Sequence, residues 1–515
     1  MLKKHSINLL VVLLVVFVFV GVLSLNVLAE EDDRYGGTIR VPIEDVSLPR
    51  MDPHYADNMG NQNIGLFIAE PLVFFTDGEY LPVLAEDWEI SEDAATYTIF
   101  IREGVLFHNG KTLTAVDVKE NFERISNESL VQAGSLSGIE SMNVLDDYTL
   151  EVNLDDPNPF FLSNLQELVI LDPDSWVDID QDDGVVGTGP FQYDVDSFSS
   201  ESGQTLTRFD DYWRGLPYLE EVEVVITGGR DASRIQLERG ELQIAPFADF
   251  SVANTLEDAG MQVFPFGRIN WARIVFNHQN VDLPIRRAIN YAFNPDPVLN
   301  SPAIFAGFGI LQNTIAYPDT DFYLSDLGYG YDPDRAKEIL DEAGWVDPGD
   351  GVREKDGEKL VLNFPTREGM GWSQATQMIQ SMLRQVGIDS EITVQPSSTF
   401  YTNVRTGEYD LAWWLTNSPP QPSIATETYD ARNYWSVIQV TIDEMQGKLE
   451  EAEATIDADE RAELYRDLQK MHYDNAVSAL GIWMKQVQIV RPELQGFKTT
   501  SFGHFYNIHD WWLEN

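Results

Sequence analysis

The sequence predicts an α/β protein of two or three domains. Its 515 residues exceed what one ordinary hydrophobic core holds together. Short β-rich runs alternate along the chain with segments of helical periodicity, which is the pattern of an α/β fold. With 43% hydrophobic and 11% aromatic residues, the chain can bury large cores and does not have the composition of a disordered protein.

The clearest local pattern lies in residues 84–124. Thr96–Ile101 alternates apolar and polar residues and predicts a strand. Val105–His108 predicts a second, shorter strand after a turn. Thr114 then begins a predicted helix, because Asp117 stands three residues later at the spacing of a capping box.

Further elements follow along the chain. Strands are predicted at 37–42, 146–154 and 409–415, and helices at 374–386 and 459–475. Tyr331–Trp345 predicts a helix with Asp332 as its N-cap, Pro333 at its first position and Gly344 at its end.

Residues 84–124 resemble a signature of the family 5 solute-binding proteins, the extracytoplasmic receptors of ABC importers for peptides, nickel chelates and related solutes. Other segments that resemble the family extend from about residue 36 to about residue 500, including Gly187–Phe191 (GTGPF) and Arg208–Leu219. The signature positions that match are Trp88, Tyr97, Arg102, Gly104, Val105, Phe107, His108, Gly110, Thr114, Ala115, Asp117 and Val118.

The resemblance implies a two-lobed periplasmic binding protein fold of type II, similar to cluster C, with an extra inserted domain and a ligand cleft between the lobes. In such proteins two crossing strands join the lobes. The implied division is lobe 1 (domain I) from 35–75, 187–264 and 487–515, an inserted domain II from 76–186, and lobe 2 (domain III) from 265–486.

The N-terminal segment predicts export. Lys3 and Lys4 precede an apolar run over residues 9–25, and Val27-Leu28-Ala29 has the small residues of a cleavage site. We expect a signal peptide at 1–29 and a periplasmic protein; an uncleaved membrane anchor is the alternative. The chain has no cysteine, which excludes disulfides, a thiolate nucleophile, cysteine-ligated metal and a lipidated cysteine anchor.

The charge is strongly acidic, with 84 acidic against 34 basic residues and a net charge of −50. Nucleic acid and anionic membrane surfaces are therefore poor partners. The acidic residues are scattered along the sequence. We favour a solvated surface adapted to high salt, where counter-ions screen the self-repulsion, over an acidic functional patch.

Motifs for other chemistries fail on spacing. Gly104–Thr112 has one residue too many for a phosphate loop, and 178–189 lacks the glycine and glutamate of a calcium loop. No HExxH motif or nucleophile elbow is present. We expect no catalytic residues, no metal site and no cofactor.

The candidate ligand segment is Tyr409–Pro422 (YDLAWWLTNSPPQP), a predicted strand that ends in a proline-rich loop. Peptide-binding relatives have a similar segment, in which a tryptophan lines the cleft and an aspartate receives the peptide's α-amino group. When the segments are aligned on that tryptophan, Trp414 matches it and Asn417 falls at the aspartate. Asparagine offers a hydrogen bond but no ion pair. The candidate ligand-binding residues are Trp413, Trp414, Asn417, Arg432, Tyr434 and Trp435.

We expect a monomeric receptor that captures a solute and delivers it to the membrane-spanning permease subunits of an ABC importer. A peptide is the default solute that the family resemblance implies. A nickel chelate and an oligosaccharide are the alternative ligands. A secreted hydrolase would need a catalytic constellation, which the sequence does not offer. A periplasmic chaperone or a chemoreceptor partner would share the fold and stays open as a further alternative.

Overall fold

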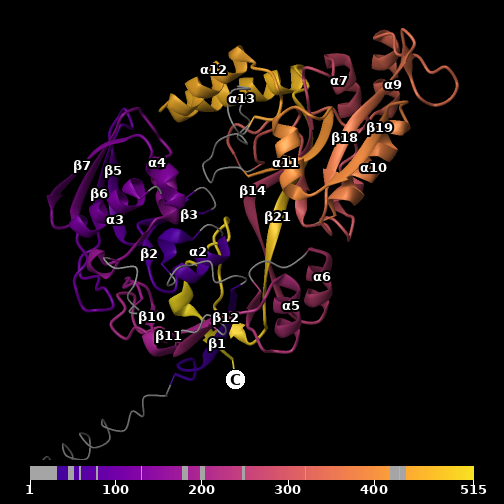
Figure 1. Cartoon of the computed structure of the whole chain (residues 1–515). Helices are drawn as coiled ribbons and strands as arrows, with labels where there is room; N and C mark the ends of the chain where they lie inside the picture. Colours follow the sequence, from indigo (N-terminus) through magenta and orange to yellow (C-terminus); the bar gives the residue numbers. More distant parts are fainter. Residues whose placement is uncertain are drawn as a thin grey trace, which may run out of the picture.

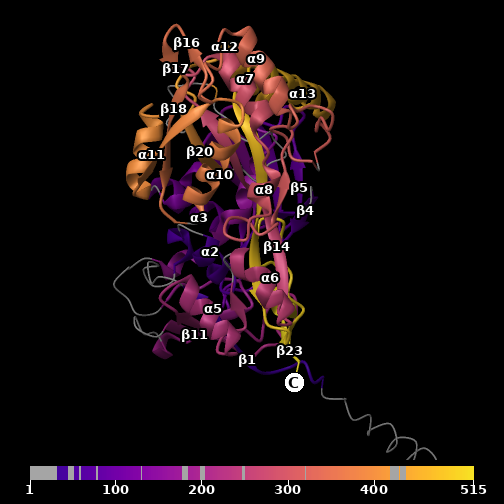
Figure 2. The same cartoon turned by 90° about the vertical axis from the view of Figure 1, so that its right-hand side faces the viewer.

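Two long antiparallel strands, β14 (Gln262–Phe276) and β21 (Ser478–Val490), run from one lobe of the computed structural model into the other (Figures 1 and 2). Nearly every residue of β21 is buried, as expected for a strand covered on both faces. The sheet has the order β13–β21–β14–β20, and β15 also pairs with β21. Its other strands are β13 (Ile244–Ala245), β15 (Gly309–Leu311) and β20 (Leu411–Asn417).

The structure describes most of the chain. The described residues are 32–43, 52–56, 59–76, 79–128, 130–176, 184–197, 203–245, 250–318, 320–369, 371–417, 429 and 436–514.

The lower lobe in Figure 1, lobe 1, is built on a four-stranded sheet of order β1–β12–β11–β10. β1 pairs in parallel with β12, and the other pairs are antiparallel. Ile39 and Val41 of β1 are fully buried, which confirms the strand predicted at 37–42. The strands are β1 (Thr38–Ile43), β10 (Phe191–Tyr193), β11 (Gly203–Arg208) and β12 (Glu221–Ile226).

A second four-stranded sheet, of order β5–β6–β8–β7, is antiparallel throughout. The predicted strand Thr96–Ile101 is β6, and its residues alternate between partly exposed and buried. The predicted helix is α3 (Ala115–Asn127); Thr114 and Asp117 form the predicted capping box, with the Thr114 main-chain N–H 2.8 Å from Asp117 Oδ2. The other strands are β5 (Ala85–Ile90), β7 (Ile139–Asp146) and β8 (Thr149–Leu154).

The strand predicted at Val105–His108 was wrong. The segment lies between Gly104 and Gly110, which both adopt positive φ, and makes only an isolated bridge between Leu106 and Thr112. The main-chain N–H of His108 donates instead to Gly187 O at 3.0 Å. Two turns so close together leave no length for a paired strand.

The upper lobe, lobe 2, carries a parallel unit in which β18 (Val361–Arg367) is followed by α10 (Trp372–Arg384) and β19 (Asp389–Gln395). The predicted helix at 331–345 is α9 (Pro333–Glu342). Asp332 caps it by accepting from the Arg335 main-chain N–H at 2.9 Å. The predictions at 374–386 and 459–475 correspond to α10 and α13. The remaining helices of this lobe are α7 (Leu283–Ala292), α8 (Asp296–Leu299), α11 (Ser397–Arg405), α12 (Asp443–Ala454) and α13 (Ala458–Asp474).

Shorter elements complete the described part of the chain. Further helices are α2 (Met59–Gly65), α4 (Phe161–Asn164), α5 (Arg230–Glu238) and α6 (Phe250–Asp258). The 3-10 helices are η2 (Pro53–Tyr55), η3 (Val131–Leu136), η4 (Leu165–Glu167), η5 (Pro173–Ser175), η6 (Val195–Ser197) and η7 (Ile508–Asp510). Two-stranded pairs are formed by β2 (Glu70–Pro71) with β9 (Val169–Ile170), β3 (Val73–Thr76) with β4 (Glu79–Pro82), β16 (Glu354–Lys355) with β17 (Glu358–Lys359), and β22 (Leu494–Gln495) with β23 (Trp512–Leu513).

The buried side chains follow this division. One core runs through lobe 1 and the β5–β6–β8–β7 sheet, and two others pack mainly in lobe 2. The predicted domain limits at 264/265 and 486/487 fall inside β14 and β21, the strands that cross between the lobes; the limits themselves stay predictions. Within the described residues, no helix is both long and apolar enough to cross a bilayer.

Candidate functional site

Three strands of lobe 2 end on the same side of the lobe: β18 and β19, which form a two-stranded sheet, and β20 of the five-stranded sheet. β18 and β19 are parallel, and Arg367 at the end of β18 lies opposite Gln395 at the end of β19. Asp410, just before β20, is hydrogen-bonded to Asn363 near the start of β18, so these two strands start at the same side. β20 ends at Asn417. We call the edge formed by Arg367, Gln395 and Asn417 the carboxyl edge; ligands of open α/β sheets bind outside such edges.

The carboxyl edge is turned toward lobe 1. β20 is antiparallel to β14, with Leu411 opposite Phe276 and Asn417 opposite Asn270. β14 enters lobe 2 from lobe 1, so Asn270 lies nearer to lobe 1 than Phe276 does. A solute at this edge would therefore lie between the lobes.

Trp413 and Trp414 occupy adjacent positions of β20, and both side chains are buried, with exposed fractions of 2% and 5%. Neighbouring residues of a strand point to opposite faces of the sheet. The Trp413 ring lies edge-on to Phe293 at 6.0 Å. The Trp414 ring contacts Phe400 at 6.0 Å and lies edge-on to Tyr401 at 5.3 Å. Both rings thus belong to the core of lobe 2, and their contact with a ligand stays a prediction.

The other predicted ligand residues are placed less fully. Asn417 is the last residue of β20. Its main chain is described, and its side chain lies outside the described part of the structure. Arg432, Tyr434 and Trp435 lie outside the described residues altogether. Tyr429, close to them in sequence, is fully buried.

Arg367 is a candidate residue that the sequence analysis missed. Its guanidinium lies 4.0 Å from the ring centroid of Trp372 and 5.8 Å from that of Tyr401, and Nη1 donates to Ser397 Oγ at 3.3 Å. Partial burial lowers the pKa of Arg367. Tyr401 also contacts Trp414, so one aromatic cluster joins the predicted tryptophan to this cation. A cation stacked on aromatic faces at a strand end suits a carboxylate ligand.

The position of Trp372 depends on a tight turn. Gly371, the N-cap of α10, has φ +72°, and a Cβ there would come within 2.3 Å of Ala303 O. Only glycine fits this left-handed position against a carbonyl oxygen. No strand was predicted before Arg367, so the sequence alone carried no signal that this arginine stands at a strand end beside α10.

Arg273 adds a second cation beneath the edge. It lies in β14 opposite Trp414, is 2% exposed, and stacks 3.6 Å from the ring centroid of Trp271. Burial lowers the pKa of Arg273 to about 9, so it keeps its proton at neutral pH. Burial and then the charge of Arg273 hold the pKa of His472 well below its usual range.

The described residues of the carboxyl edge suit solute binding and include no constellation for bond cleavage. The described groups of this edge are guanidinium groups, aromatic rings, the amide of Gln395 and the hydroxyl of Ser397, which together suit the recognition of carboxylates and planar groups. Within the described residues, no cluster of three or more His, Cys, Asp or Glu side chains has the arrangement of a metal site.

Comparison with known proteins also finds solute-binding proteins. Residues 79–436, more than half of the chain, match the pattern of the bacterial extracellular solute-binding proteins, family 5 (middle region). The dipeptide-binding protein of Escherichia coli (strain K12) is 26% identical over 473 residues, covering 84% of this chain and 86% of its own. The nickel-binding periplasmic protein of the same strain is 25% identical over 492 residues, covering 87% and 90%.

A solved structure shows the same fold. NikA from Brucella suis, in complex with Fe(III)-EDTA, superposes with a TM-score of 0.76 over 93% of this chain and 100% of its own, at 22% identity.

Proposed function

The chain belongs to family 5 of the bacterial extracellular solute-binding proteins, and we propose that it captures a small peptide between its lobes and delivers it to the permease subunits of its ABC importer. As a solute-binding protein of ABC importers it is not an enzyme, and no bond of the solute is made or broken. Closure of the two lobes would be driven by contacts that the solute makes with both.

The observation that carries the proposal is Arg367 at the carboxyl edge, 4.0 Å from the ring of Trp372. In a protein of net charge −50, a cation at an edge turned toward the other lobe favours an anionic group of the solute. Every peptide with a free C-terminus carries such a carboxylate. We assign that carboxylate to Arg367, with Arg273 adding positive charge beneath it. The dipeptide-binding relative supports peptides as the solute class.

We propose that the α-amino group contributes little to recognition. The position that carries an aspartate in peptide-binding proteins with a similar segment is Asn417 here. An amide in place of a carboxylate removes a charge-assisted hydrogen bond to the ammonium. Trp414 would pack on the solute, and Arg432, Tyr434 and Trp435 would complete the site.

A metal chelate is the second candidate. It is favoured by the nickel-binding relative and by the similar fold of NikA in complex with Fe(III)-EDTA. EDTA and peptides share carboxylate groups, so the same cations would serve both. A chelate differs from a peptide in its metal content, which mass spectrometry detects directly.

We further propose that residues 1–29 are a signal peptide cleaved after Ala29 and that the mature chain is a periplasmic monomer without a lipid anchor. The division into lobe 1, inserted domain II and lobe 2 at the predicted limits is part of the same proposal. N-terminal sequencing of the exported protein should begin at Glu30; a mature chain that still carries Lys3 would exclude cleavage.

The experiment that tests the function is native mass spectrometry of the full chain as purified from its own host. The proposal predicts an added mass that fragments into amino-acid residues. An added mass with the isotope pattern of nickel would support the chelate instead. An added mass that fragments into hexose units would support the oligosaccharide and exclude both.

A further inference from the structure

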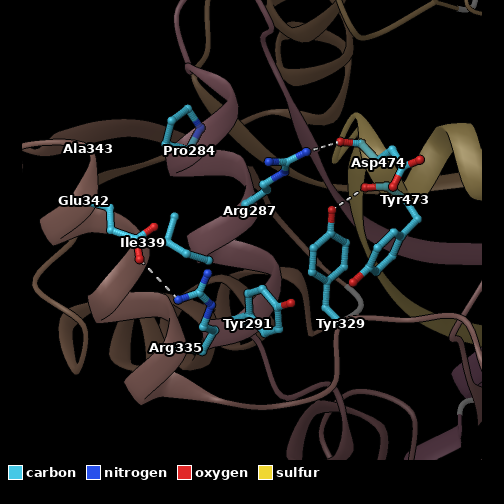
Figure 3. A pocket seen from close by; sticks show the side chains of 10 residues that line it. All are labelled: Pro284, Arg287, Tyr291, Tyr329, Arg335, Ile339, Glu342, Ala343, Tyr473 and Asp474. Atoms are coloured by element: carbon cyan, nitrogen blue, oxygen red, sulfur yellow. Dashed lines mark hydrogen bonds and ion pairs between the residues drawn. The ribbon is translucent and has the colours of Figure 1, made fainter.

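A cavity of about 350 Å³ lies where α7, α9 and the C-terminal end of α13 meet, on the side of lobe 2 turned away from lobe 1 (Figures 1 and 3). Nothing in the proposed transport function uses it. Its volume lies in the range of natural small-molecule sites. Ile339, half-buried Pro284 and Ala343 give it an apolar wall.

Three tyrosines form an aromatic wall opposite. The rings of Tyr329 and Tyr473 stack at 4.3 Å, and Tyr291 stands perpendicular to Tyr329 at 5.1 Å. The hydroxyl of Tyr329 donates to the carbonyl oxygen of Tyr473, which holds the stack against the end of α13 (Figure 3). Burial raises the pKa of Tyr329, so that hydroxyl stays a donor at neutral pH.

Two guanidinium groups also line the cavity, that of Arg287 and that of Arg335 (Figure 3). Arg287 donates through Nη2 to Asp474 O at 2.7 Å, which fixes its position. Arg335 donates through Nη1 to Glu338 at 2.8 Å, while its contact with Glu342 is long, at 3.5 Å. A guanidinium has five N–H donors, and these bonds use one nitrogen of each arginine. Further donors of both groups can reach a ligand.

We propose that this cavity is a second small-molecule site that binds a planar ring carrying a carboxylate. The ring packs between the tyrosines and the apolar wall around Ile339, and the carboxylate is bound by Arg335 and Arg287. The lining also contains the acidic residues Glu342 and Asp474, but the remaining N–H donors of the two guanidinium groups need an acceptor, and a carboxylate accepts them more strongly than a neutral group does. Arg335 Nη1 is held mainly by Glu338 at 2.8 Å, and Glu342, which lines the cavity 3.5 Å from the same nitrogen, would compete with the ligand's carboxylate for this arginine.

The test uses 4-fluorophenylacetate as probe and ¹⁹F NMR of the full chain, at the salt concentration where the protein is most stable. The neutral analogue 4-fluorophenylacetamide has nearly the same shape. We expect the acid to bind at least about tenfold more tightly than the amide, the effect of losing a charge-assisted hydrogen bond.

Three variants locate the probe. Arg335→Gln should weaken binding of the acid by about tenfold or more. Glu342→Gln should increase the affinity for the acid severalfold, because one competing carboxylate is removed. Asp334→Asn is the matched control: it also removes one negative charge from α9, but Asp334 pairs with Lys337 outside the cavity and is not among its lining residues. It should leave the affinity unchanged.

Thermal melts of each variant show that it is folded, which is expected because the side chain of Arg335 is 41% exposed. Equal binding of the acid and the amide would overturn the proposal. So would an Arg335→Gln protein that is folded and binds the acid as tightly as the parent, or a parent protein that does not bind the acid at millimolar concentration.

Discussion

His108 and Gly189 are joined by a hydrogen bond in which the ring Nε2–H of His108 donates to the carbonyl oxygen of Gly189 at 3.0 Å. The other ring nitrogen, Nδ1, accepts from the main-chain N–H of Gly187 at 3.3 Å. The two bonds can form together only when the ring is neutral, because both nitrogens of the imidazolium carry a proton and neither can accept. Burial lowers the pKa of His108 to about 4, in agreement with this geometry.

We therefore predict that His108 makes stability depend on pH. Its folded pKa lies below the unfolded value of about 6.5, so the unfolded chain binds the proton first as pH falls. The stabilisation is complete above about pH 6.5 and is lost as pH falls toward about 4. A shift of this size corresponds to about 2–4 kcal/mol.

The measurement is denaturant unfolding at pH 7.5 and pH 4.5 in constant salt, for the parent and for His108→Gln. Other groups also titrate: burial lowers the pKa of His504 to about 4 and raises that of Glu70, which acts in the opposite direction. The difference between the two proteins isolates His108. Equal pH dependence in both would show that the ring is not held neutral.

A second prediction concerns Trp414. Alanine at this position should weaken solute binding by about 1–3 kcal/mol, the scale of a lost aromatic contact. Because the ring is buried against Phe400 and Tyr401, the change should also lower stability. Calorimetry at a temperature where the variant is folded separates the two effects.

Trp413→Ala is the comparison for that variant. Trp413 is equally buried but points to the other face of the sheet, toward Phe293, so its loss should reduce stability with a smaller effect on affinity. Unchanged affinity in folded Trp414→Ala protein would remove this ring from the site.

A third prediction concerns salt. A net charge of −50 repels itself at low ionic strength, and counter-ions screen that repulsion. The thermal midpoint should therefore rise steeply from low to molar sodium chloride. Sucrose, which stabilises folded proteins without screening charge, is the control. A midpoint that is flat or falls with salt would contradict adaptation of this surface to high salt.

A fourth prediction concerns Arg367. Replacing it with glutamine should weaken the binding of a carboxylate-bearing solute by about 1.5–3 kcal/mol, the contribution of a hydrogen bond to a charged group. Arg384→Gln is the matched control, because Arg384 ends α10 and pairs with Asp389 at 2.8 Å on an exposed surface. If both variants bind the solute as the parent does, the carboxylate lies elsewhere.

The sequence predicted elements whose cause is local. The capping box of Thr114 and Asp117 and the cap of α9 at Asp332 depend on residues within one helical turn, and both were confirmed. The strand predicted at Val105–His108 failed because turns at Gly104 and Gly110 enclose it, and because the His108 main-chain N–H donates to Gly187, about eighty residues away, which a local pattern does not reveal.

The candidate site was harder to predict, for the same reason. Trp414 could be singled out from its resemblance to a family segment. Arg367 could not, because Trp372 and Tyr401 reach it from two different helices. Arg273 could not be predicted as buried, because a charged residue in an apolar run is ordinarily assigned to the exposed face of a strand, whereas in the structure its guanidinium packs on the Trp271 ring.

Calorimetry with one peptide in three forms, free, N-acetylated and C-amidated, distinguishes recognition of the carboxylate from recognition of the α-amino group. In the proposed site the carboxylate binds Arg367, and the α-amino group meets no acid at Asn417. Amidation should therefore weaken binding by about tenfold or more, and acetylation should change it by less than about tenfold. The opposite result, in which the free peptide binds more than about tenfold more tightly than its acetylated form and no more tightly than its amidated form, would show that an acid in the site recognises the α-amino group and that Arg367 does not bind the carboxylate.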